Sequence, residues 1–96
     1  MTRTEVLAWL DTRRPAPPAT LRERLEGAVH DAPLPLAAHL AELGRELLAR
    51  VTSRPAGGRE LALDLLAADA FVTYAFEAQA EERVGNLARL AEEARL

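Results

Sequence analysis

The chain has 96 residues, a length that fits one domain with a modest core, and its formal net charge is −3. It contains no cysteine, which excludes disulfides, thiolate metal sites and cysteine nucleophiles. Every basic side chain is an arginine, and the arginines alternate with acids without forming a basic stripe, so the sequence disfavours nucleic acid as a partner.

The composition favours helices. Ala, Leu, Arg and Glu make up more than half of the chain, and no stretch is typical of a β-strand. The apolar run from Val6 to Leu10 is too short and too close to Glu5 for a secretory signal, so we expect a cytoplasmic protein. The most apolar stretch, residues 61–80, contains three acids that argue against a membrane span: Asp64, Asp69 and Glu77.

A first helix is predicted over residues 3–13. Thr2 and Glu5 have the spacing of a capping box, in which a hydroxyl and a carboxylate each bond a free backbone N–H at the start of a helix. Three prolines then end the helix, because proline lacks the N–H donor: Pro15, Pro17 and Pro18. We expect a short, stiff connector there.

Two further helices are predicted in the first half of the chain. Thr20 and Glu23 repeat the capping-box spacing, which predicts a second helix over residues 20–30. A third helix, over residues 34–52, has a continuous apolar side formed by Leu36, Leu40, Leu43, Leu47 and Val51.

A fourth helix is predicted over residues 59–83. Large apolar side chains point in almost every direction around it: Leu61, Leu63, Leu65, Leu66, Phe71, Val72, Tyr74 and Phe76. Because a helix that is apolar on all sides must be surrounded, we expect this one to be long and central, unless another protomer or a partner protein covers one of its sides. We also expect the four aromatic residues in the core: Trp9, Phe71, Tyr74 and Phe76.

The dipeptide Gly85-Asn86 predicts either a stop or a kink, and residues 86–96 are expected to be helical in both cases. The expected fold is therefore all-α. It is a single domain, residues 1–96, arranged as a small bundle of four or five helices.

The C-terminal residues carry a pattern that is typical of a close-packed helical pair. Small and apolar residues alternate at spacings of four and three: Ala80, Val84, Leu87, Ala91 and Ala94. We therefore expect a protein–protein interaction module rather than an enzyme. It would self-associate, as a homodimer, through the fourth helix and the C-terminal segment, with an interface formed by Val84, Leu87, Ala91 and Ala94. A different protein partner is the other possibility, and no membrane is expected to bind.

An alternative function rests on polar residues within the fourth helix. Asp69, Thr73 and Glu77 are spaced four apart and lie on one side of it. A buried carboxylate needs a partner, a proton or water, so these residues and Tyr74 would line a polar pocket for a ligand or for catalysis. The simpler explanation is pairing of the acids with Arg24, Arg45 or Arg50, or a solvated edge.

No metal, cofactor or catalytic residue is predicted. His30 and His39 are the only histidines, and Glu26 precedes His30 by four residues rather than by the three of di-iron bundles. His39 shares a helix edge with Glu42 and Glu46, which predicts a solvated face. Ser53, the single serine, has no histidine nearby in sequence that could activate it.

Overall fold

The computed structural model describes residues 1–53 and 57–95, and within them the chain forms four helices and no strand. The helices are α1 (Arg3–Leu10), α2 (Ala19–Ala28), α3 (Leu36–Thr52) and α4 (Arg59–Ala94). With 36 residues, α4 is by far the longest, and the molecule is correspondingly elongated, measuring 60 × 25 × 19 Å. The predicted all-α class and the long fourth helix are confirmed.

The predicted start of α1 is confirmed and its predicted end is wrong. The Thr2 hydroxyl accepts from the backbone N–H of Glu5 at 3.1 Å, and the Glu5 carboxylate accepts from the N–H of Thr2 at 2.9 Å, which is the capping box. The helix stops at Leu10 because the Trp9 carbonyl accepts both the N–H and the hydroxyl of Thr12. In a longer helix, that carbonyl would accept from the N–H of Arg13.

Prolines determine where α2 and α3 begin. Helix α2 starts at Ala19 directly after Pro18 and has no side-chain cap, so the capping box predicted at Thr20 and Glu23 is wrong. Helix α3 starts at Leu36 rather than at residue 34, because the residue before Pro35 is disfavoured in helical geometry.

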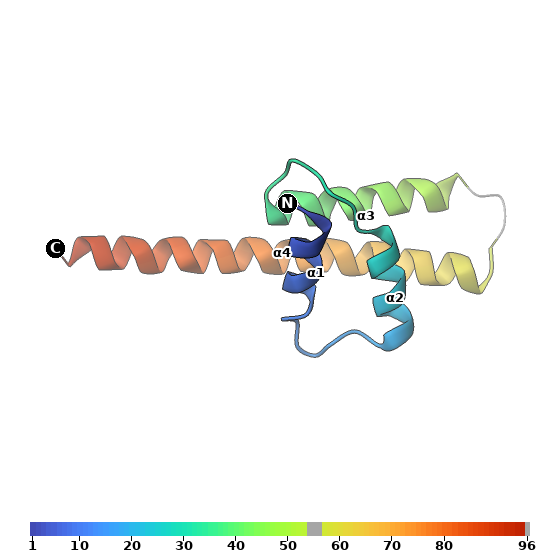
Figure 1. Ribbon diagram of the computed structural model, residues 1–96, viewed down its shortest axis with the longest axis horizontal. Coiled ribbons are helices and arrows are strands. Elements are labelled where there is room, and N and C mark those ends of the chain that lie inside the picture. Colours follow the sequence, from blue (N-terminus) through green and yellow to red (C-terminus); the bar gives the residue numbers. More distant parts are fainter. Residues whose placement is uncertain (54–56, 96) are drawn as a thin grey trace.

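The core lies mainly between α3 and α4, which run alongside each other, while α1 and α2 cover a second side of α4 (Figure 1). Gly44 of α3 allows the closest approach. A Cβ atom at this position would lie 3.2 Å from the Ala68 carbonyl oxygen and 3.3 Å from the Phe71 Cβ. The largest fully buried apolar side chains among the described residues are Phe71, Leu10, Leu25, Leu40, Leu43 and Val6.

Helix α4 begins at a glycine for a conformational reason. Gly58 has a φ of 108°, in the left-handed region that side chains with a Cβ rarely adopt. The predicted turn at residues 53–59 lies partly outside the described residues.

A separate fifth helix is not confirmed, because α4 continues through Gly85 and Asn86. The Asn86 side-chain oxygen accepts from the guanidinium of Arg89 at 2.7 Å instead of capping a new helix. A glycine inside a helix costs only about 1 kcal/mol, which the long helix tolerates.

A bundle that encloses α4 is not confirmed either. Among the described residues, Ala78 is the last buried residue of α4, and the helix then leaves the rest of the fold (Figure 1). One side of its first half packs on the other helices, and the opposite side is exposed. None of the described helices combines the length and apolar character that crossing a bilayer demands.

Candidate functional site

The most unusual surface of the protein is the exposed apolar side of α4. Among the described residues, eight large apolar side chains are exposed, and seven of them belong to this helix: Leu65, Leu66, Val72, Phe76, Val84, Leu87 and Leu90, with Leu48 on α3 as the eighth. Single exposed apolar residues are ordinary, but a concentration on one element marks an interaction site. The prediction that Phe76 lies in the core is wrong, since 69% of this residue is exposed.

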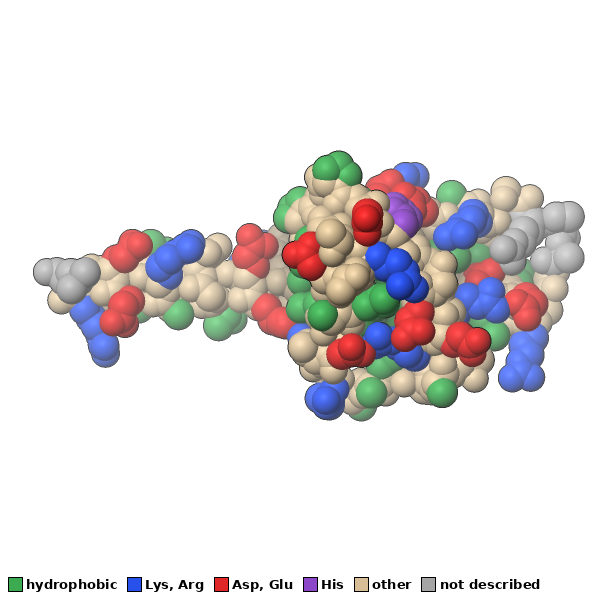
Figure 2. Space-filling view, viewed as in Figure 1, with side chains coloured by type: hydrophobic (Ala, Val, Ile, Leu, Met, Phe, Trp, Pro, Cys, Tyr) green, Lys and Arg blue, Asp and Glu red, His purple; other side chains and the backbone are tan. Residues whose placement is uncertain are grey.

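The last part of α4, residues 79–95, is here called the projecting segment, and every one of these residues is exposed. At 1.5 Å per residue it extends about 25 Å beyond the last buried residue. Figure 2 shows hydrophobic side chains along it, beside acidic and basic ones. A helix of this length without tertiary packing is only marginally stable in water.

The predicted interface residues all lie in the projecting segment. Val84, Leu87, Ala91 and Ala94 are exposed and, together with Ala80, occupy an arc of about 80° around the helix. Their arc is opposite to the direction in which Phe71 and Ala78 enter the core. The structure therefore leaves these residues available to a partner.

Three of the four residues predicted to line a polar pocket lie on the surface. Asp69 and Thr73 are exposed, and Glu77 forms an ion pair with Arg13 at 3.3 Å rather than with Arg24, Arg45 or Arg50. None of the four predicted residues lines any of the grooves described below. For Asp69, the solvated edge considered from the sequence is what the structure shows.

Tyr74, the fourth of these residues, packs between α4 and α1. Its ring meets the Trp9 ring edge to face, with the centroids 6.0 Å apart, and burial raises the pKa of its hydroxyl, with a further contribution from Glu77. The Arg13 guanidinium lies over the Trp9 ring, 3.8 Å from the ring centroid. It also forms an ion pair with Glu81 at 2.7 Å. These contacts attach α1 to α4 where α4 leaves the fold.

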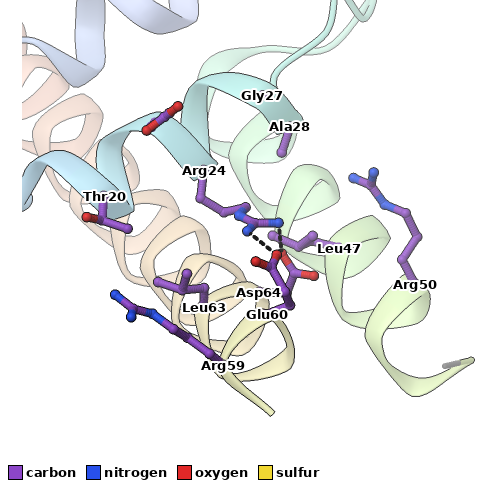
Figure 3. Close-up of a pocket in the computed structure, with 11 residues that line it drawn as sticks. Thr20, Arg24, Gly27, Ala28, Leu47, Arg50, Arg59, Glu60, Leu63 and Asp64 are labelled. Atoms are coloured by element: carbon purple, nitrogen blue, oxygen red, sulfur yellow. Dashed lines mark hydrogen bonds and ion pairs between the residues drawn. The ribbon is translucent and has the colours of Figure 1, made fainter. Parts of the chain in front are cut away.

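A polar groove of about 510 Å³ lies between α2, α3 and the start of α4 (Figure 3). Arg24 reaches across it from α2 and bonds Asp64 at 3.0 Å and Glu60 at 2.6 Å. Asp64 is almost completely buried, so it is the buried carboxylate of this helix, and Asp69 is not. Arg50 and Arg59 also line the groove, where they and Arg24 balance Glu23, Glu60 and Asp64. Through these bonds Arg24 attaches α2 to the start of α4.

The sequence did not identify Asp64 as the buried acid, because helical periodicity alone does not distinguish it from the other acids of α4. Its one sequence signal is the excess of acids in residues 60–82, which requires arginines from elsewhere in the chain. Which arginine reaches which acid depends on how α2 crosses α4.

The two histidines are adjacent, with ring centroids 5.9 Å apart, but they have different environments. His39 is fully buried, and its Nε2–H donates to the His30 carbonyl at 2.8 Å, so the predicted solvated face is wrong. His30 is exposed and lies 2.7 Å from Glu46. The carbonyl of Asp31 and then the Glu46 carboxylate raise the pKa of His30. Within the described ranges, no group of three acids or histidines could hold a metal ion.

Comparison with known proteins found no matching family model, no matching curated protein and no matching solved structure. The function therefore has to be inferred from the geometry and chemistry of this chain.

Proposed function

We propose that this protein is a small helical interaction module that self-associates through the exposed side of α4 and its projecting segment. One observation carries the proposal: seven large apolar side chains are exposed on α4, three of them beyond the last buried residue of the fold. The arrangement favours a partner that lies along the helix.

The energetics of the projecting segment support this function. Val84, Leu87 and Leu90 are each at least 59% exposed, and burying such a side chain contributes about 1.5–3 kcal/mol. No described residue from another helix buries this part of α4. A partner would supply the apolar contacts that a helix of this length needs to be stable.

The charged residues of the same segment favour a protein over a lipid surface. They are four acids, Glu81, Glu82, Glu92 and Glu93, against three arginines, Arg83, Arg89 and Arg95. Helices that bind anionic membranes are instead rich in basic residues on their polar side. The alternative of a ligand pocket at Asp69 and Glu77 has less support, because both acids are exposed and Glu77 is paired with Arg13.

The oligomeric state tests the proposal. We expect sedimentation equilibrium to give a dimer at micromolar concentration, and Leu87→Glu to give a monomer with unchanged near-UV circular dichroism, since Leu87 is 66% exposed and lies outside the core. Arg89→Glu is the control, because it introduces a glutamate two residues away, on the side of the helix opposite to the apolar arc, and changes the charge even more than Leu87→Glu does. A wild-type monomer at every concentration would contradict self-association.

A further inference from the structure

The exposed side of α4 contains a row of residues whose positions are symmetric about Phe76. The row, here called the outer stripe, consists of Ala62, Leu65, Asp69, Val72, Phe76, Ala80, Arg83, Leu87 and Leu90. The intervals are three, four, three and four up to Phe76, and then four, three, four and three after it. All of these residues are exposed, and at 100° per residue they fall within an arc of about 80°.

We propose that two copies of this chain pair antiparallel along the outer stripe, with Phe76 of each copy at the two-fold axis. This inference rests on the proposed self-association and adds its orientation and register. A two-fold interface must be complementary to itself, because the same surface occurs on both copies. A stripe with a symmetric order of spacings meets this condition in the antiparallel orientation.

The register follows from distances along the chain. Residues equally far from Phe76 face each other, so Leu65 of one copy meets Leu87 of the second copy, and Val72 meets Ala80. At the ends, Ala62 meets Leu90. The contact extends over 28 residue steps, from 62 to 90, which is about 42 Å of helix. These apolar pairs join the first half of α4 to the projecting segment of the other copy.

Two charged residues determine the orientation. Asp69 and Arg83 lie seven residues on either side of Phe76, and neither side chain makes a hydrogen bond or ion pair within the described part of the chain. In the antiparallel register, Asp69 of each copy faces Arg83 of the other, which gives two ion pairs. In a parallel register, Asp69 would face Asp69 and Arg83 would face Arg83. Repulsion of like charges therefore disfavours the in-register parallel pairing, which the apolar residues alone would allow.

The surface beside the stripe is hollowed next to the stripe's centre. A shallow groove of about 410 Å³ lies between α3 and α4, next to the centre of the stripe. Val72 and Phe76 line it from α4, and Ala37, Ala38 and Ala41 line it from α3. Such small residues allow close approach of two helix backbones. In the proposed register, the middle of α4 of the second copy would lie over this groove, and its projecting segment would continue past the groove toward Leu48, the one large exposed apolar residue among the described residues of α3.

Disulfide trapping tests the orientation, and the absence of native cysteine makes the experiment unambiguous. In the antiparallel dimer, the thiols introduced by Asp69→Cys on both copies would be 14 residue steps, about 21 Å, apart along the axis. The same separation applies to Arg83→Cys, and it is well beyond the roughly 7 Å limit between Cα atoms of a disulfide. We therefore expect each single variant to stay uncrosslinked under mild oxidation. Their mixture should form a covalent dimer.

A charge exchange provides a second readout. Asp69→Arg and Arg83→Glu should each weaken the wild-type dimer at least about ten-fold, and the double variant should restore the dissociation constant to within about three-fold. A dimer in which each single cysteine variant crosslinks with itself, or in which the double charge variant is not restored, would overturn the antiparallel register while leaving self-association intact. A monomeric wild type would overturn both proposals.

Discussion

The two halves of α4 belong to one continuous helix and are rich in the same apolar residues, yet their environments are opposite. In the first half, Ala67, Ala68 and Phe71 are buried against neighbouring helices, and in the described projecting segment nothing is buried. Phe71 and Phe76 show the contrast most directly, because they are five residues apart and 0% and 69% exposed. Burial along α4 is therefore determined by where α1, α2 and α3 end, and the remaining apolar surface is left to a partner.

The largest expected effects would come from these two phenylalanines. We expect Phe71→Ala to reduce the free energy of unfolding by about 3–5 kcal/mol, as large-to-small substitutions of buried aromatic residues do. Phe76→Ala should change the stability of the monomer by less than about 0.5 kcal/mol, because its side chain is in solvent. The same change should weaken the dimer at least about ten-fold by removing the central contact of the stripe.

Urea unfolding at protein concentrations below the dissociation constant of the dimer measures the stability of the monomer alone. At higher protein concentrations, dimerisation adds to the apparent stability. If Phe76→Ala destabilised the monomer as much as Phe71→Ala, the outer side of α4 would be part of the core. The contrast between the two sides of the helix would then be wrong.

Local features of the fold could be predicted from the sequence because they depend on neighbours along the chain. The Thr2–Glu5 capping box and the apolar side of α3 involve residues at most a few positions apart, and both are present. The capping box at Thr20 was wrong because Pro18 already starts α2 one residue earlier. A proline and a capping residue gave competing signals, and the proline determined the boundary.

Features that depend on the packing of distant segments could not be predicted. Phe71 and Phe76 are equivalent in hydropathy, and only the positions of α1 to α3 decide which is buried. His39 is a further example. Its burial depends on the connection between α2 and α3, which places the His30 carbonyl next to the His39 ring. The symmetric spacing around Phe76 is present in the sequence, but it acquires meaning only once these positions are known to be exposed.

Two arginine contacts of α4 offer a smaller test of the same comparison. Arg24 attaches the first half of α4 to α2 through Asp64, whereas Arg89 in the projecting segment bonds Asn86 of its own helix. We expect Arg24→Ala to cost about 2 kcal/mol, which is below the cost of breaking a fully buried pair because the Arg24 side chain is 31% exposed. Arg89→Ala should cost less than about 0.5 kcal/mol. Equal losses in thermal unfolding would mean that the projecting segment is also held by tertiary contacts.

Two glycines test the same contrast, because Gly85 lies in the projecting segment and Gly44 of α3 packs against the first half of α4. No atom lies within 4 Å of a Cβ built on Gly85, so Gly85→Ala should stabilise the helix by about 1 kcal/mol and raise the circular dichroism signal at 222 nm. At Gly44, the new methyl group would press on the Ala68 carbonyl, which belongs to the backbone of α4 and cannot move alone. We expect Gly44→Ala to cost about 1 kcal/mol instead. A gain at both positions would show that α3 and α4 are less tightly packed than their geometry indicates.

The smallest expected effect concerns pH, and it separates the stability of the folded domain from association. Because the Asp31 carbonyl and Glu46 raise the pKa of His30 above its ordinary value of 6.5, the folded state binds this proton more tightly than the unfolded chain does. The resulting stabilisation is fully present below pH 6.5 and is lost as the pH rises through the higher pKa of the folded state. It should be small, since the His30 side chain is 48% exposed and solvent screens the pair with Glu46. His30→Gln should remove this slope from urea unfolding measured across neutral pH. The dissociation constant of the dimer should stay constant over the same range, because His30 is not part of the outer stripe. If the dissociation constant changed together with the stability, the interface would include His30.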